Sequence, residues 1–124
     1  DITIVSYSTQ FLRCIEAVKE LEEAGISVEL IDLRTISPWD RDCVLASAEK
    51  TGRAIVVHEA LRSFGPGAEI ASTISEELFG KLKAPVRRLG APYSAVPFSK
   101  PLEQAYLVQP ADVVACAREL MARG

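Results

Sequence analysis

The sequence has few of the residues on which most catalytic sites depend. It contains one histidine, His58, three cysteines, one tryptophan and 6% aromatic residues. The cysteines are far apart and form no Cys-x-x-Cys pair, which leaves zinc binding and dithiol chemistry without support. A Gly-x-Ser-x-Gly elbow is also missing, so a hydrolase nucleophile is not indicated. We expect Cys14, Cys43 and Cys116 to be reduced core residues of a cytoplasmic protein.

Charge and hydropathy exclude further classes. The 14 basic and 17 acidic residues give a net charge of −3, and this is not the basic footprint of a nucleic-acid-binding protein. No apolar run approaches the ~18 residues of a transmembrane candidate, and no signal-peptide pattern is present. We therefore expect neither a nucleic acid nor a membrane as partner. The chain starts at Asp1 without a methionine, and we expect it to be a piece of a longer protein.

What the sequence does contain is a repeated alternation of strand and helix patterns. Four β-branched or apolar stretches predict strands over 2–7, 26–33, 53–58 and 86–89. Apolar residues at helical spacing follow the first three strands, and a last helix opens at Pro110. Ser8 or Thr9 is expected to cap the first helix, and the Ser37-Pro38-Trp39-Asp40 stretch to start the second with Ser37 as its cap. This alternation predicts a single α/β domain with a parallel sheet between two layers of helices.

Two features near the end of the third predicted strand could carry a function. His58 lies where open α/β sheets place their ligand crevice, and it is either a functional group or a structural histidine that faces a partner subunit. Gly65-Pro66-Gly67 precedes a helix, so its amides could hold an anion, or it is a tight turn that allows close packing. Position 70 is isoleucine, where the dinucleotide fingerprint needs a third glycine. Glu69 would then lie in the first helical turn, where the helix dipole favours a carboxylate, and a buried or interfacial role is the alternative for it.

Aromatic residues indicate contact with another surface. Trp39 is either a packing anchor or an interface residue. Tyr93, Phe98 and Tyr106 lie in a long proline-rich stretch over 90–109, and such long connections usually serve a function or pack at an interface. By alternation, Arg87 and Arg88 point to opposite faces of the sheet, so at least one of them must leave the core or find a partner, and a salt bridge is the default expectation.

Several motifs, taken together in their order and spacing, resemble one family. They are 5–8 (VSYS), 31–40 (IDLRTISPWD), 51–53 (TGR), 56–60 (VVHEA), 64–70 (FGPGAEI), 84–88 (APVRR), 92–98 (PYSAVPF) and 102–107 (LEQAYL). The sequence is similar to the C-terminal domain of the β subunit of thiamine-diphosphate-dependent 2-oxo acid dehydrogenases, which include pyruvate, branched-chain and acetoin members. The similarity covers essentially the whole chain.

This resemblance implies a transketolase C-terminal-like fold with strand order 2-1-3-4. It implies an enzyme of two α and two β subunits that decarboxylates a 2-oxo acid, with pyruvate the first expectation, and acylates a lipoyl group. Thiamine diphosphate and magnesium then bind outside this domain, so no catalytic, cofactor-binding or metal residue is assigned here. The implied partners are the α subunit, a second β subunit and the dihydrolipoyl acyltransferase core. The interface candidates are Trp39, His58, Phe64, Glu69, Tyr93, Phe98 and Tyr106.

Two alternatives stay open. A stand-alone flavodoxin-like module would bind a small ligand in a polar pocket near Ser8 and Glu59. The chain could also be the C-terminal domain of another transketolase-family enzyme. Ser63, Phe64 and Pro66 depart from the commoner glycine-rich form of the loop, and this departure leaves the substrate open.

Overall fold

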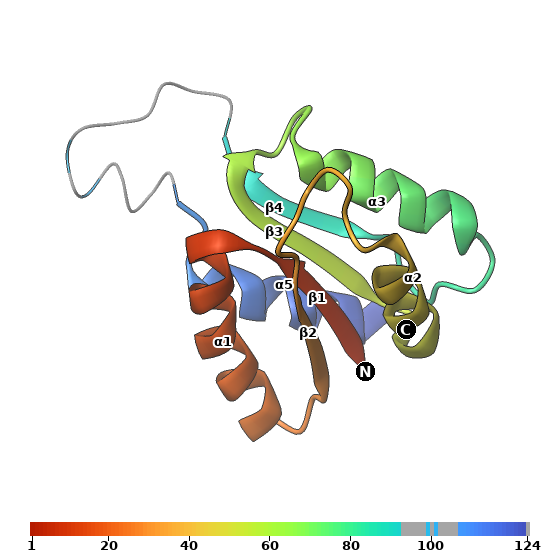
Figure 1. Cartoon of the computed structure of the whole chain (residues 1–124). Coiled ribbons are helices and arrows are strands. Elements are labelled where there is room, and N and C mark those ends of the chain that lie inside the picture. Colours follow the sequence, from red (N-terminus) through yellow and green to blue (C-terminus); the bar gives the residue numbers. More distant parts are fainter. Residues whose placement is uncertain (93–98, 100, 102–106, 124) are drawn as a thin grey trace.

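A four-stranded parallel sheet forms the centre of the computed structural model, which describes residues 1–92, 99, 101 and 107–123 (Figure 1). The strands follow the order β2-β1-β3-β4, and every pairing among them is parallel. The elements are β1 Ile2–Ser6, α1 Ser8–Glu23, β2 Val28–Asp32, α2 Arg41–Thr51, β3 Ala54–Leu61, α3 Pro66–Glu77, β4 Arg87–Ala91 and α5 Pro110–Arg123. The three-layer αβα fold and the strand order expected from the sequence are confirmed.

Helices cover both faces of the sheet (Figure 1). Helices α1 and α5 pack on one face, where Ile4 and Ile55 belong to the first hydrophobic cluster. Helices α2 and α3 pack on the other face, where Val5 and Val56 belong to the second. Because side chains alternate along a strand, β1 and β3 supply both clusters. The continuous apolar pattern of 54–57 therefore marks a strand that is buried on both faces.

Two of the predicted helix caps are wrong. Helix α1 begins without a side-chain cap, because Tyr7 occupies the capping position and Ser8 is already in the first turn with a left-handed φ of 59°. Helix α2 begins at Arg41, and Asp40 caps it by accepting a hydrogen bond from the Cys43 amide at 3.2 Å. Aspartate caps as well as serine does, so the nearer of the two side chains holds the helix and Ser37 lies outside it.

The third strand is longer than its pattern indicated. β3 continues to Leu61, and the register with β4 shifts between Val57 and Leu61. His58 therefore lies within the irregular part of the strand and not at its end. The prediction for the cysteines is right for Cys14 and Cys116, which are buried, and wrong for Cys43, which is exposed on α2. Within the described part of the chain, none of the helices is long and apolar enough to cross a membrane.

Candidate interaction surface

His58 lies beneath the loop that joins β3 to α3, at the carboxyl end of the sheet. Its side chain is 1% exposed, and the Tyr7 ring centroid lies 6.1 Å from the His58 ring. Two glycines make room for it: a Cβ at Gly67 would lie 2.5 Å from His58 Nε2, and one at Gly90 would lie 2.9 Å from Cε1. The glycine at 67 is therefore a close-packing residue, as the tight-turn interpretation expected, and the imidazole fills the space below the first turn of α3.

Burial favours the neutral form of the imidazole. Neither Nδ1 nor Nε2 has a hydrogen-bond partner among the described residues. Burial lowers the pKa of His58, the Arg88 charge acts in the same direction, and the backbone at His58 and Ala60 opposes both in part. A partner could reach this histidine only by displacing the loop above it, so its expected contact with a partner is at most indirect.

The loop above His58 presents an aromatic side chain to solvent. Phe64 is 98% exposed and has a φ of 62°, a left-handed conformation that bulky residues rarely adopt. The next residue, Gly65, has no room for a side chain, because a Cβ there would lie 2.1 Å from the Leu61 carbonyl oxygen. The strained backbone thus directs the Phe64 ring away from the core. Such strain persists where the surrounding structure imposes it, and it is concentrated at functional sites.

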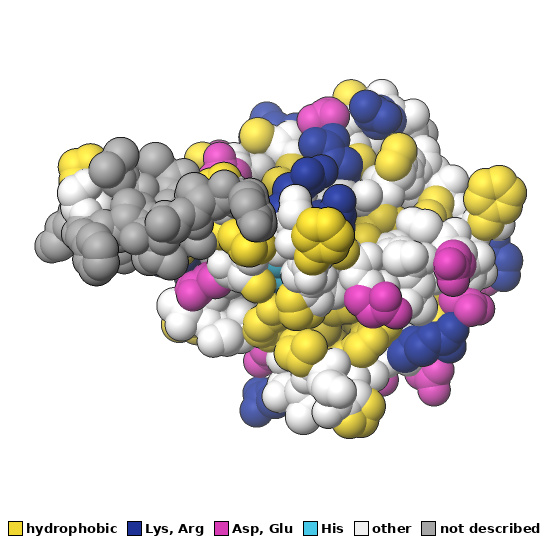
Figure 2. Space-filling view, turned by 90° about the horizontal axis from the view of Figure 1, so that it is seen from above, with side chains coloured by type: hydrophobic (Ala, Val, Ile, Leu, Met, Phe, Trp, Pro, Cys, Tyr) yellow, Lys and Arg dark blue, Asp and Glu magenta, His cyan; other side chains and the backbone are white. Residues whose placement is uncertain are grey.

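An apolar groove lies beside Phe64. Its volume is about 360 Å³, and its lining residues are Ile36, Trp39, Phe64, Gly65, Pro66, Glu69 and Ile70. Half-buried Ile36 and Trp39 pack against the second hydrophobic cluster, so this core continues to the surface here. Figure 2 shows hydrophobic side chains gathered in the middle of this face, with arginine and lysine side chains beside them. We call the lining residues of this groove the Phe64 surface.

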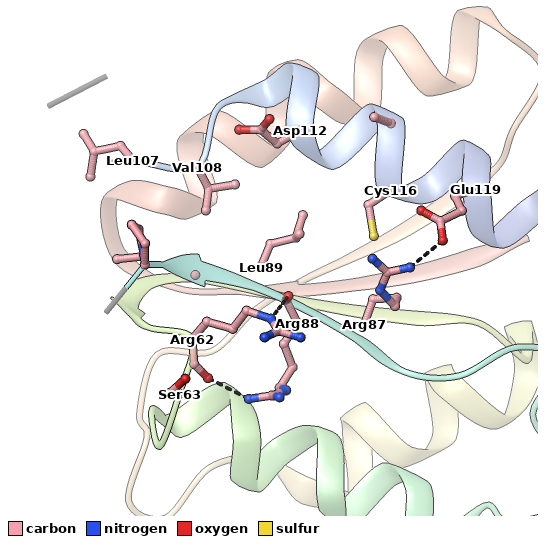
Figure 3. Close-up of a pocket in the computed structure, with 14 residues that line it drawn as sticks. Arg62, Ser63, Arg87, Arg88, Leu89, Leu107, Val108, Asp112, Cys116 and Glu119 are labelled. Carbon is pink, nitrogen blue, oxygen red and sulfur yellow. Dashed lines mark hydrogen bonds and ion pairs between the residues drawn. The ribbon is translucent and has the colours of Figure 1, made fainter. Parts of the chain in front are cut away.

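A second and wider groove lies between β4 and α5 (Figure 3). Its volume is about 760 Å³, and Leu89, Val108 and Cys116 form part of its apolar lining. Arg87 crosses it to Glu119 on α5, with Nη1 2.7 Å from Oε1. This ion pair raises the pKa of Arg87 and confirms the salt bridge predicted for that arginine.

Arg88 is placed as alternation predicted, on the face opposite to Arg87, but it has no salt bridge among the described residues. Its Nη1 donates to the Arg62 carbonyl oxygen at 2.6 Å, and Arg62 Nε donates to the Arg88 carbonyl oxygen at 3.3 Å. Figure 3 shows both side chains below β4, on the side away from Leu89 and α5.

The structure brings together three of the seven interface candidates. Trp39, Phe64 and Glu69 line one groove, and Glu69 is exposed, so the buried alternative for it is excluded. Tyr93, Phe98 and Tyr106 lie outside the described residues. Half-buried Ile36 and buried Ile70 also line the groove and were not predicted as part of an interaction site, because their apolar character is typical of core positions.

Other kinds of site find little support. Across the part of the chain that the structure describes, no group of three histidine, cysteine, aspartate or glutamate side chains could hold a metal ion. Glu59, where a flavodoxin-like pocket was expected, forms an ion pair with Arg13 at 3.7 Å. The two larger grooves are lined by residues other than Ser8 and Glu59. The geometry thus defines a parallel α/β domain whose most distinctive feature is an apolar surface beside a strained loop.

Comparison with known proteins identifies the family. Residues 1–113 match the family described as "Transketolase, C-terminal domain", and the chain belongs to it. Among solved structures, a chain described as "Split gene transketolase, inactive beta4 tetramer" superposes with a TM-score of 0.84 at 28% sequence identity. That match covers 98% of this chain and 39% of the other. The transketolase C-terminal-like fold implied by the motifs is confirmed.

Curated relatives are β subunits of dehydrogenases. The chain is 40% identical over 124 residues to the β subunit of the acetoin:2,6-dichlorophenolindophenol oxidoreductase of Cupriavidus necator. It is 42% identical over 121 residues to the pyruvate dehydrogenase E1 component subunit β of Bacillus subtilis, and it spans 37% of the length of each of these two. It is also 52% identical over 92 residues to the mitochondrial 2-oxoisovalerate dehydrogenase subunit β of Chaetomium thermophilum, of which it covers 20%. The resemblance to 2-oxo acid dehydrogenase β subunits is confirmed.

Proposed function

We propose that this chain is the assembly domain at the carboxyl end of the β subunit of a 2-oxo acid dehydrogenase decarboxylating component, located in the cytoplasm. In that role it contacts the α subunit, a second β subunit or the dihydrolipoyl acyltransferase core, while the chemistry takes place on other domains. The observation that carries the proposal is the Phe64 surface, where a hydrophobic cluster continues to the surface under a fully exposed aromatic ring. Apolar patches with aromatic anchors are typical of protein interfaces.

The substrate of the whole enzyme is proposed as a 2-oxo acid, with pyruvate to be assayed first. Thiamine diphosphate and magnesium would supply the decarboxylation chemistry, and the residues described here do not fit them. Among the described residues, no group of three histidine, cysteine, aspartate or glutamate side chains could hold the magnesium ion, and charged side chains such as Arg87 and Arg41 are paired with Glu119 and Glu77. Calorimetric titration of the chain with magnesium and thiamine diphosphate is expected to show no tight binding. Tight binding would contradict the proposal that the cofactor binds outside this domain.

The assembly role is tested by replacing Phe64. In the full-length subunit that contains this chain, Phe64→Ala is expected to weaken association with its partner subunits by about tenfold or more, the effect of losing an interface anchor. The melting temperature of the unassembled subunit should not change, because Phe64 is 98% exposed in the chain itself. Sedimentation velocity over a concentration series measures the first quantity and calorimetry the second.

Phe79 provides the matched control. It is also an exposed phenylalanine, at 89%, but it follows α3 and lies at the opposite end of the sheet. Phe79→Ala should leave association unchanged. Equal weakening by Phe64→Ala and Phe79→Ala would show that the Phe64 surface is not the interface, and a large fall in melting temperature for Phe64→Ala would make Phe64 an ordinary stabilising residue.

A further inference from the structure

Two arginines on one side of β4 have no acidic partner among the described residues. Arg88 lies opposite Val56 in the sheet register, and Val56 belongs to the cluster below α2 and α3, so Arg88 projects toward α3. Arg62 follows directly after β3, and its amide donates to the Ala91 carbonyl oxygen at 2.9 Å. These backbone contacts bring two like charges together in a chain whose net charge is −3.

The contacts between the two residues fix the positions of their guanidinium groups. Each side chain donates to the backbone carbonyl oxygen of the other residue, Arg88 at 2.6 Å and Arg62 at 3.3 Å. These two bonds hold both guanidiniums in place and use two of their ten N–H groups. Both arginines border the same groove as Ser63, but their guanidinium groups lie on the side of β4 away from α5, where Asp112 and Glu119 line that groove (Figure 3). Arg87, which is adjacent in sequence, is by contrast neutralised by Glu119.

A bound anion would balance the two guanidinium charges, for which the described residues offer no acidic partner. Planar guanidinium groups bind carboxylates and phosphates through parallel hydrogen bonds, and a second arginine adds charge and donors to the same oxygens. The positive end of the α3 dipole, which begins at Pro66, adds to the local potential. We propose that Arg62 and Arg88 form a binding site for an oxyanion, the carboxylate or phosphate group of a small molecule.

The chain contains its own reporter for this site. His58 is the only histidine, its imidazole is buried, and the Arg88 charge is one of the influences on it. An oxyanion on Arg88 would offset that charge and shift the His58 ring signals in an NMR spectrum. The Nε–H signals of Arg62 and Arg88 would report the same event directly.

The experiment is a titration of the chain with inorganic phosphate, and separately with citrate, at constant pH and ionic strength, with sodium chloride as the reference. We expect a saturable shift of the His58 and Arg88 signals with at least one of the two oxyanions. Saturation by phosphate alone assigns a phosphate ligand, and saturation by citrate alone assigns a carboxylate. Shifts no larger than those with chloride would overturn the proposal.

Variants separate the site from general charge effects. Arg88→Ala is expected to weaken the binding by about tenfold or more, and Arg88→Lys by less, because lysine keeps the charge but not the two-pronged geometry. Arg62→Ala, which removes an exposed side chain outside the core, provides a second test should Arg88→Ala fold poorly. Arg118→Ala on the exposed face of α5 removes the same charge elsewhere. Equal weakening by Arg118→Ala would refute a defined site.

Discussion

The two ends of the sheet differ in how completely their buried polar groups are hydrogen-bonded. At the amino end, the Thr3 hydroxyl lies 2.7 Å from the Ser47 hydroxyl and 2.8 Å from that of Thr51, and buried Arg53 donates to the carbonyl oxygen of Leu120 at 3.3 Å. At the carboxyl end, the buried Ser6 hydroxyl donates to the Val57 carbonyl oxygen at 2.7 Å, but buried His58 has no hydrogen-bond partner among the described residues.

Strain and exposure follow the same division. The carboxyl end carries Phe64 with its left-handed backbone and the pair of arginines for which the described part of the chain offers no acidic partner, whereas the hydroxyl network at the amino end is satisfied. Satisfied polar networks stabilise and specify a core, and unsatisfied or strained groups persist where other constraints hold them. We infer from this difference that the amino end of the sheet mainly stabilises the domain, and that functional residues are to be sought at the carboxyl end.

The largest expected effect comes from filling the space above His58. Gly67→Ala should destabilise the chain by about 3 kcal/mol, the upper end of the usual cost of overpacking, because the new Cβ would lie 2.5 Å from His58 Nε2. The ring cannot easily move aside, since Gly90 and Gly65 also pack against it. Denaturant unfolding measures the change.

A double-mutant cycle shows whether the imidazole is the cause. In a His58→Ala background, Gly67→Ala should lower the free energy of unfolding much less than in the native chain. The two substitutions are then strongly coupled. If Gly67→Ala lowers the free energy of unfolding equally in both backgrounds, the close packing of Gly67 against His58 is not the cause of the destabilisation.

A smaller effect is expected at the amino end. Thr3→Val keeps the shape of the side chain but removes the hydroxyl that bonds Ser47 and Thr51. It should cost about 1–2 kcal/mol, because it deprives the buried Ser47 hydroxyl of its Thr3 partner, whereas Thr51 still donates to the Arg53 carbonyl oxygen at 2.9 Å. Thermal or denaturant unfolding of Thr3→Val, Ser47→Ala and the double variant would measure the coupling. Additive effects would contradict a cooperative network and weaken the contrast between the two ends.

The smallest expected effect is a dependence of stability on pH. The folded state lowers the pKa of His58 from its ordinary value of 6.5, so the unfolded chain takes up a proton more readily than the folded chain. Stability at the carboxyl end should therefore fall as pH drops below about 6.5 and level off below the folded pKa. The comparison of unfolding curves for the native chain and His58→Gln isolates this effect, since no other histidine is present. If the free energy of unfolding of His58→Gln depends on pH as steeply as that of the native chain, His58 is not the source of the pH dependence.

Much of the fold was predictable from local patterns. Spacing along the chain predicted the succession of strands and helices, the burial of β3 on both faces and the opposite directions of Arg87 and Arg88. The caps at Ser8 and Ser37 were wrong because several neighbouring polar residues can each start a helix, and packing selects among them. Of the surface, Trp39, Phe64 and Glu69 were predicted as candidates, but nothing in the sequence indicated that they line one groove.

By itself the sequence determined a parallel α/β domain and the family to which it belongs, because periodicity and motif spacing are properties of the chain. Only the tertiary structure decided the place of His58, which depends on an irregular strand and on Gly90, 32 positions further along the chain. It also decided that Arg62 and Arg88 meet. These contacts arise between segments that the sheet brings together, and no local pattern encodes a contact between residues on different strands.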